Sequence, residues 1–169
     1  PLRLPIVVSP TTTATEICLY TKSPITPLSF DNTNFLASGL AGSTFNVFVR
    51  LTSEAGQESP IESPQDVHVF AGRKEVSFNA KNCSFKALVS EKAGFTTVFT
   101  VKYNDLKPVA VHVTSVPGLP ASLRLLPAVN CKFVCGEGLT NGIVCQMLDE
   151  HSNPLTLDKT TPIKIEPSS

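Results

Sequence analysis

The 169-residue chain has no tryptophan, a single methionine and no net charge at pH 7. Charged residues make up only 17% of it, against 41% hydrophobic residues. Because the charges balance, no overall field attracts nucleic acid or an anionic membrane, and we expect no direct nucleic-acid binding. The low charge also excludes intrinsic disorder, since the chain holds enough apolar residues to form a core.

Segments that would direct the chain to a membrane are missing as well. The sequence has no run of 18 or more apolar residues, which a membrane-spanning helix would need. Its first ten residues lack the basic region and the long apolar region of a signal peptide. We therefore expect no membrane segment in this stretch, which we interpret as a fragment of a longer chain.

Motifs that carry known chemistry are also lacking. The sequence has no G-x-S-x-G, no H-E-x-x-H, no phosphate-binding glycine loop and no EF-hand series. His68 and His112 each stand between two valines of an alternating segment, which predicts that they lie on the exposed side of a strand. His151 stands in a predicted turn. We expect no catalytic residues, no cofactor and no enzymatic activity.

Residues that form strands and turns are abundant instead. The chain contains 14 prolines, 9 glycines and 10 phenylalanines, which suits short strands joined by turns better than a helical bundle. No ten-residue stretch shows the periodicity of a helix. Alternation of apolar and polar residues predicts long strands at 45–51, 95–103 and 109–114, a hairpin turn at 104–108, and shorter strands at 67–70, 76–78 and 87–89.

An internal repeat is the most informative feature of the sequence. Residues 8–20 recur in character as 116–126, at an offset of about 107 residues, and 47–60 recur as 144–154, at an offset of about 97. A repeat of this length matches one immunoglobulin-like sandwich of roughly 100 residues. The two offsets differ by what one loop insertion would supply.

These patterns predict an all-β fold of immunoglobulin-like β-sandwich repeats in tandem. We assign residues 1–9 to the last strand of a preceding repeat, 10–116 to a complete sandwich, and 117–169 to the first half of a following repeat. The linker Val116-Pro117-Gly118 is short and stiffened by its proline. Such a junction would fix the geometry between neighbouring repeats.

Several segments resemble the immunoglobulin-like repeats of the invasin and filamin types. The resemblance rests on residues 41–51, the turn 54–60, the strand 93–98 and the closing segment 116–121. Similar divergent repeats occur in the middle region of structural-maintenance-of-chromosomes hinge-domain-containing proteins, which silence chromatin. These families imply rods or scaffolds without catalytic residues. The Gly-Asn pair usual in the invasin-type turn is replaced here by Gly56-Gln57 and Ser152-Asn153, which argues against bacterial kinship.

Five cysteines are the main candidates for metal binding or cross-linking: Cys18, Cys83, Cys131, Cys135 and Cys145. An odd number leaves at least one thiol without an internal partner, which favours a reducing, intracellular compartment such as the nucleus. A zinc site of Cys131, Cys135, Cys145 and His151 has the right ligand types but not the paired spacing of a zinc finger. Disulfides Cys131–Cys135 or Cys131–Cys145 are alternatives. Unmodified thiols and no metal are the main expectation.

The sequence predicts a non-catalytic structural or interaction module, a rigid spacer or scaffold segment of a larger protein such as a chromatin-associated one. Its expected partners are neighbouring repeats of the same chain and a protein that the sequence does not identify. An extracellular adhesin repeat is the alternative, and glycosylation of the acceptor triplet Asn82-Cys83-Ser84 would indicate it. A third interpretation, an accessory domain of an enzyme, would need a catalytic domain elsewhere in the parent chain.

Overall fold

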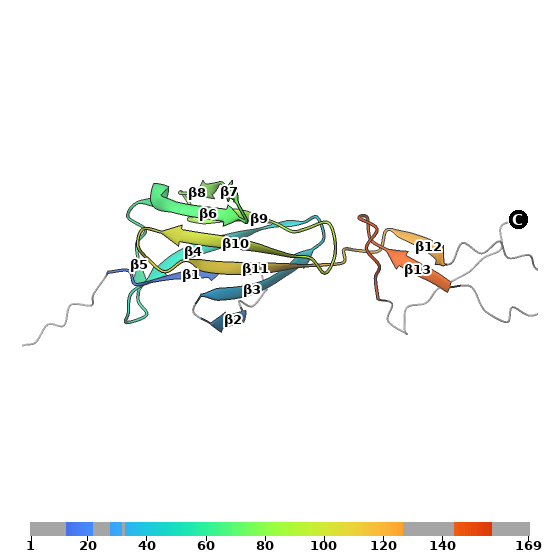
Figure 1. The fold of residues 1–169 in the computed structure, drawn as a ribbon, viewed down its shortest axis with the longest axis horizontal. Helices are drawn as coiled ribbons and strands as arrows, with labels where there is room; N and C mark the ends of the chain where they lie inside the picture. Colours follow the sequence, from blue (N-terminus) through green and yellow to red (C-terminus); the bar gives the residue numbers. More distant parts are fainter. Residues whose placement is uncertain (1–12, 22–27, 32, 127–143, 157–169) are drawn as a thin grey trace, which may run out of the picture. The chain divides into compact units, whose positions relative to one another are not determined.

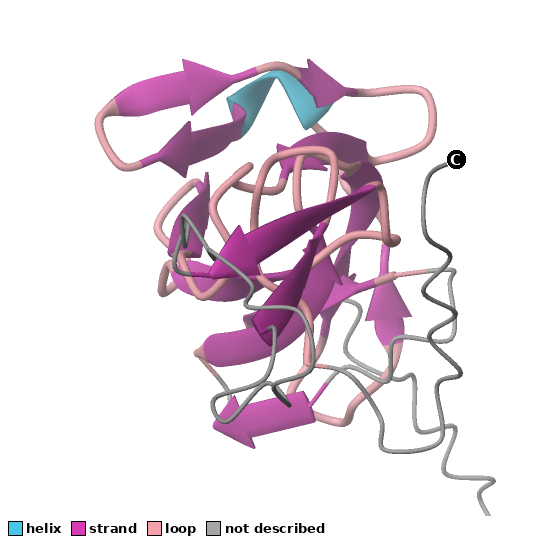
Figure 2. Cartoon of the chain, turned by 90° about the vertical axis from the view of Figure 1, so that its right-hand side faces the viewer, coloured by secondary structure: helices cyan, strands magenta, loops and turns pink. Residues whose placement is uncertain are grey.

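The computed structural model of the chain describes residues 13–21, 28–31, 33–126 and 144–156. The chain divides into two compact units, Pro1–Val116 and Pro117–Ser169, which we call unit 1 and unit 2 (Figure 1). The only helical segment within the described ranges is the 3₁₀ turn η1, Pro64–Asp66, drawn in cyan in Figure 2. No helix in this part of the chain is long and apolar enough to span a bilayer.

Unit 1 consists of two sheets of short and medium strands. The five-stranded sheet has the order β1-β4-β9-β8, with β5 paired to β4. Its strands are β1 (Glu16–Tyr20), β4 (Thr44–Thr52), β5 (Glu58–Ser59), β8 (Phe78–Asn79) and β9 (Ser84–Leu88). All pairs in this sheet are antiparallel.

The six-stranded sheet has the order β2-β3-β11-β10-β6-β7. Strand β3 runs parallel to β11, and the other neighbours are antiparallel. Its strands are β2 (Leu28–Asp31), β3 (Asn34–Leu40), β6 (Val67–Ala71), β7 (Lys74–Val76), β10 (Thr96–Tyr103) and β11 (Val109–Val116). Facing sheets with these orders form an immunoglobulin-like sandwich, to which β2 adds an edge strand. The predicted all-β sandwich is therefore confirmed.

The core of unit 1 lies between the two sheets. Its residues alternate along each strand, as a sheet buried on one face requires. The rings of Phe85 in β9 and Phe99 in β10 join the layers, with centroids 5.7 Å apart. The most completely buried side chains come from both sheets: Ile17, Val47, Val49, Leu51, Phe85, Val69, Val101 and Val113.

Two of the predicted strands differ in detail from the observed ones. The predicted strand 76–78 is divided at Ser77, because β7 pairs with β6 in one sheet and β8 pairs with β9 in the other. The predicted strand 95–103 begins at Thr96, after a turn in which Gly94 has a φ of 79°. The alternation predicted that Phe95 would face the core together with Phe99 and Val101. Phe95 instead lies in the turn before the strand and is 56% exposed.

The chain enters and leaves the sandwich of unit 1 at opposite ends. At the start of β1, Glu16 pairs with Thr52, the last residue of β4. At the end of β11, the carbonyl oxygen of Val116 accepts a 2.8 Å hydrogen bond from Ala41, which precedes β4. The two points are therefore separated by the length of β4, whose nine residues span about 30 Å at the usual rise per residue of a β-strand. Figure 1 shows β1 beginning and β11 ending at opposite ends of unit 1.

In the described part of unit 2, β12 (Ser122–Leu126) and β13 (Val144–Leu148) form an antiparallel pair. A turn follows β13, in which Asp149 N donates to Asn153 O at 3.0 Å and Ser152 N donates to Asp149 O at 3.0 Å. Pro154 then forms an isolated bridge with Leu148. The described part of unit 2 is thus an antiparallel pair of strands with a short third segment beside it.

Candidate functional site

The outer face of the six-stranded sheet is the broadest candidate surface of unit 1. We call the outward side chains of β3, β10 and β11 the neutral face, because only one of twelve is charged. They are Asn34, Leu36, Ser38, Leu40, Thr96, Val98, Thr100, Lys102, Ala110, His112, Thr114 and Val116. An ordinary protein surface holds about 25–35% charged residues, so this face is unusually poor in charge.

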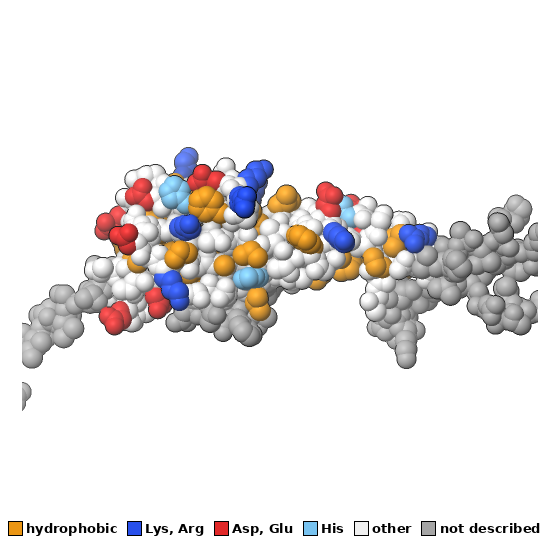
Figure 3. All heavy atoms as spheres, in the orientation of Figure 1, with side chains coloured by type: hydrophobic (Ala, Val, Ile, Leu, Met, Phe, Trp, Pro, Cys, Tyr) orange, Lys and Arg blue, Asp and Glu red, His pale blue; other side chains and the backbone are white. Residues whose placement is uncertain are grey.

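Apolar and hydroxyl side chains lie side by side on the neutral face. In the middle row, His112 is paired with Leu36 on one side and Val98 on the other. These two neighbours are 38% and 37% exposed. Figure 3 shows orange side chains scattered among uncoloured ones where Figure 1 draws these strands, while the acidic side chains of unit 1 lie toward the margins.

Polar groups on the neutral face bond to each other. A ring nitrogen of His112 lies 3.2 Å from Asn34 Oδ1, and the hydroxyl oxygens of Thr96 and Thr114 are 3.0 Å apart. None of these groups is a nucleophile held beside an oriented base, which covalent catalysis needs.

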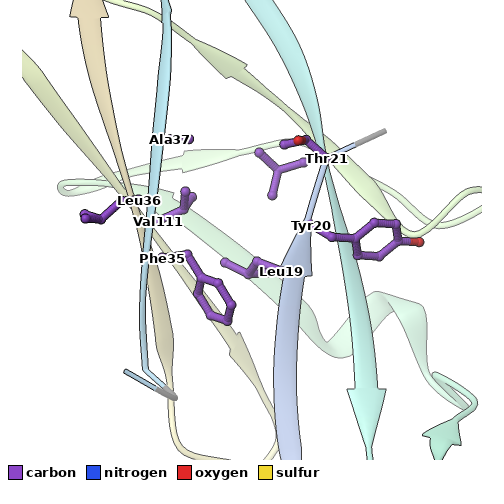
Figure 4. Close-up of a pocket in the computed structure, with 8 residues that line it drawn as sticks. Leu19, Tyr20, Thr21, Phe35, Leu36, Ala37 and Val111 are labelled. Atoms are coloured by element: carbon purple, nitrogen blue, oxygen red, sulfur yellow. The ribbon is translucent and has the colours of Figure 1, made fainter. Parts of the chain in front are cut away.

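A small apolar cavity lies between β1 and β3 where the sandwich opens. Its volume is about 20 Å³, and Leu19, Phe35, Ala37, Val47 and Val111 are among its lining residues. In Figure 4, Leu19 and Phe35 point toward each other across this gap, and Leu36 points away from it. The space is that of about one water molecule, so it is too small for an organic ligand.

A wider, open hollow of about 520 Å³ lies where β6, β7 and β8 meet. At its rim, His68 Nδ1 and Glu75 Oε1 are 2.9 Å apart, and both side chains are more than half exposed. An exposed pair of this kind contributes about 0–1 kcal/mol to stability. Within the described ranges no three His, Cys, Asp or Glu residues gather as metal ligands.

The cysteines that the structure describes are dispersed. Cys18, Cys83 and Cys145 are free thiols, each partly buried. Cys18 Sγ lies 3.6 Å from Thr52 Oγ1, and Cys83 Sγ lies 3.8 Å from the carbonyl oxygen of Ala80. The predicted positions Cys131 and Cys135 lie outside the described residues. The disulfide and zinc alternatives that involve them stay predictions.

The predicted glycosylation triplet forms a turn between β8 and β9. Asn82 is exposed, and Ser84 is buried at the start of β9. The Ser84 hydroxyl donates a 2.7 Å hydrogen bond to Asn82 Oδ1. Cys83 between them has a left-handed φ of 49°.

Asp149 is a buried polar centre, although its place in the sequence predicts only a turn residue. The side chain lies in unit 2 and the residue is 2% exposed. Its Oδ1 accepts hydrogen bonds from His151 N at 2.9 Å and Asn153 N at 2.8 Å. Its Oδ2 accepts from Gly118 N at 2.8 Å and Asn153 Nδ2 at 2.9 Å. The carboxylate therefore ties the first residues of unit 2 to the turn after β13.

Burial and hydrogen bonding act on this carboxyl in opposite directions. Burial alone would raise the pKa of Asp149, because it disfavours the charged form. The hydrogen bonds from Gly118, Asn153 and His151 outweigh burial and lower the pKa to about 2. Asp149 is therefore a structural anion at neutral pH, unlike a general acid, whose pKa lies near the working pH.

Comparisons with known proteins give little further guidance. No family model matches the chain, and no curated protein matches it. Nine chains of solved structures match, among them the surface layer protein SbsC, domains 4–9. That structure is 16% identical with a TM-score of 0.41, over 85% of this chain and 21% of its own length. The chain thus spans about a fifth of that structure, and a likeness at this level does not identify its family.

Proposed function

We propose that this chain is a non-catalytic structural module, a spacer segment built from immunoglobulin-like sandwiches in series. One observation carries the proposal: the chain enters unit 1 beside Thr52 and leaves it beside Ala41, at opposite ends of β4. A sandwich connected in this way holds its preceding and succeeding segments about 30 Å apart. A core that joins both sheets keeps that separation fixed.

The interaction part of the proposal concerns the neutral face. It offers hydroxyl groups and partly exposed apolar side chains with a single charge, Lys102. Kinship with invasin-type, filamin-type or chromatin-silencing repeats stays part of the proposal, supported by the sequence segments that resemble them. The odd number of cysteines supports a reducing compartment for this module.

An extracellular adhesin repeat is the second candidate function. The geometry of the turn at Asn82 favours it, because the asparagine is exposed and its amide oxygen accepts from the Ser84 hydroxyl. Peptide mass spectrometry of the natural protein would decide between the two settings. A glycan on Asn82 places the repeats outside the cell, and an unmodified Asn82 with reduced cysteines supports the intracellular spacer.

Stretching single molecules of the 169-residue chain between residues 13 and 116 tests the spacer proposal. These 104 residues would span about 370 Å when extended, and the folded sandwich already spans about 30 Å. We expect unit 1 to resist extension and then to lengthen in one step of about 340 Å. Gradual lengthening, or several smaller steps, would contradict a sandwich that acts as one rigid spacer.

A further inference from the structure

A pull on the two ends of unit 1 runs along its strands. The chain enters β1 at Glu16, beside the last residue of β4, and leaves β11 at Val116, at the opposite end of the sandwich. A pull that separates these two points is therefore nearly parallel to β1 and β11 (Figure 1). The hydrogen bonds of a ladder pulled lengthwise are loaded together, because they lie across the strands, whereas a ladder opened from one end loses them one after another.

The ladder between β3 and β11 is the place where the two pulls meet. Both strands run from the end where the chain enters unit 1 to the end where it leaves, and their seven pairs extend from Asn34 with Ala110 to Leu40 with Val116. A pull on the preceding chain acts on the first residue of β3, and a pull on the following chain acts on the last residue of β11. The two neighbours are thus drawn in opposite directions along a common axis.

The two ladders that precede β3 on the path of this pull are shorter. Strand β1 is held to β4 by five residue pairs, and β2 is held to β3 by three, with an irregularity between Ser29 and Asp31. When both have separated, the pull reaches the start of β3. Strand β11 is held more firmly, because it lies between β3 and β10. Among the described strands, the β3–β11 ladder is therefore the longest set of bonds that a lengthwise pull must break together.

Further contacts secure this ladder at both ends and on both faces. At its ends, Ala110 N donates to Thr33 O and Ala41 N donates to Val116 O, both at 2.8 Å. On the outer face, the bond between His112 and Asn34 joins the two strands. On the inner face, side chains of both strands belong to the core or pack against it: Phe35, Ala37, Val111 and Val113. Sliding one strand past the other would disrupt all of these contacts.

We infer that unit 1 bears tension, and that the parallel ladder of β3 with β11 is the clamp that resists it. This function rests on the serial arrangement in the proposed function, because a sandwich is pulled lengthwise when segments on both sides of it are drawn apart. Unit 1 should therefore withstand a lengthwise pull far better than a pull that opens the same ladder from one end.

Pulling single molecules of the 169-residue chain in two directions tests this inference. Handles at residues 13 and 116 load the ladder lengthwise. Handles at Thr44 and Val116 open it from one end, because Thr44 begins β4 shortly after Ala41, which bonds to Val116. At one constant force we expect unfolding to be about tenfold slower in the lengthwise direction, since the rate of forced unfolding follows the height of its barrier. Rates within about twofold of each other would overturn the inference.

Loss of a single ladder bond supplies a second test. Ala110→Pro removes the N–H that donates to Thr33 O, and it should make lengthwise unfolding about tenfold faster at the same force. Lys74→Pro is the matched control, because Lys74 is the exposed first residue of β7, an edge strand that lies off the path of the pull. The control should change the rate by less than about twofold. Equal effects of the two substitutions would show that the ladder is not the clamp.

The clamp and the rigid spacer can fail separately in these experiments. A rigid spacer lengthens in a single step between residues 13 and 116, whatever the force at which the step occurs. A clamp in addition makes the unfolding rate depend on the direction of the pull. A single step whose rate is the same in both directions would contradict the clamp and leave the spacer intact. Several smaller steps would contradict the spacer itself.

Discussion

Replacing Phe85 by alanine should destabilise unit 1 by about 3–5 kcal/mol. Phe85 is 1% exposed in β9, and its ring lies against Phe99 of the opposite sheet. Removing the ring leaves a cavity between the layers, which the surrounding strands can close only in part. A domain of this size has a total stability of about 5–15 kcal/mol, so this single change removes a large share of it.

Urea denaturation followed by far-ultraviolet circular dichroism measures this loss, since the chain has no tryptophan to report unfolding. Leu88→Ala is the matched control, because Leu88 lies in the same strand and is 62% exposed. The control should change stability by less than about 0.5 kcal/mol. If Phe85→Ala were as mild as this control, the ring would not join the two sheets.

Replacing Asp149 by asparagine should release the first residues of unit 2 from the turn after β13. The amide nitrogen of an asparagine donates hydrogen bonds, and it would face groups that already donate. At least one of the bonds from Gly118, His151 or Asn153 is then lost. Glu150→Gln removes an exposed acid from the neighbouring position and is the matched control.

The pH dependence of the same contact follows from the sign of the pKa shift. The pKa of Asp149 is lowered to about 2 in the folded chain, below the value of about 3.9 in an unfolded one. The carboxylate therefore stabilises unit 2 fully above about pH 4, and this contribution is lost as the pH falls toward 2. NMR signals of the Gly118 and Asn153 amides should shift across this range, and Asp149→Asn should abolish the shift. Amide signals that titrate near pH 4 instead would show that the carboxyl is not held in this network.

The strands with strict alternation could be predicted from the sequence, and β3 could not. In β10 and β11 the buried side chains recur at every second position, which is the signal of a half-buried strand. In β4 the core residues Val47, Val49 and Leu51 alternate in the same way, although Phe48 between them is buried as well. In β3 the larger aliphatic residues Leu36 and Leu40 point outward, and Ala37 lies on the inner side. The parallel pairing of β3 with β11 joins segments more than 70 residues apart. No local pattern encodes such a contact.

The candidate sites were predictable to a smaller extent. The alternation around His112 correctly places it on the outer face of its strand. It does not show that Leu36 and Val98 flank it, because these neighbours come from two other strands. Asp149 was recognisable only as a turn residue, through its bonds to backbone two and four residues on. Its burial depends on Gly118, 31 residues earlier in the chain.

The separation of the two ends of unit 1 tests the central claim most directly. Spin labels on non-natural side chains at Thr15 and Val116 would report it by pulsed electron paramagnetic resonance, with no change to the native cysteines. Labels at Thr15 and Glu54, which lie at one end of β4, supply the short reference distance. We expect a single narrow distribution near 30 Å for Thr15 and Val116, the length of the nine-residue strand β4. A broad distribution, or a distance as short as the reference, would contradict a rigid sandwich that the chain enters at one end and leaves at the other.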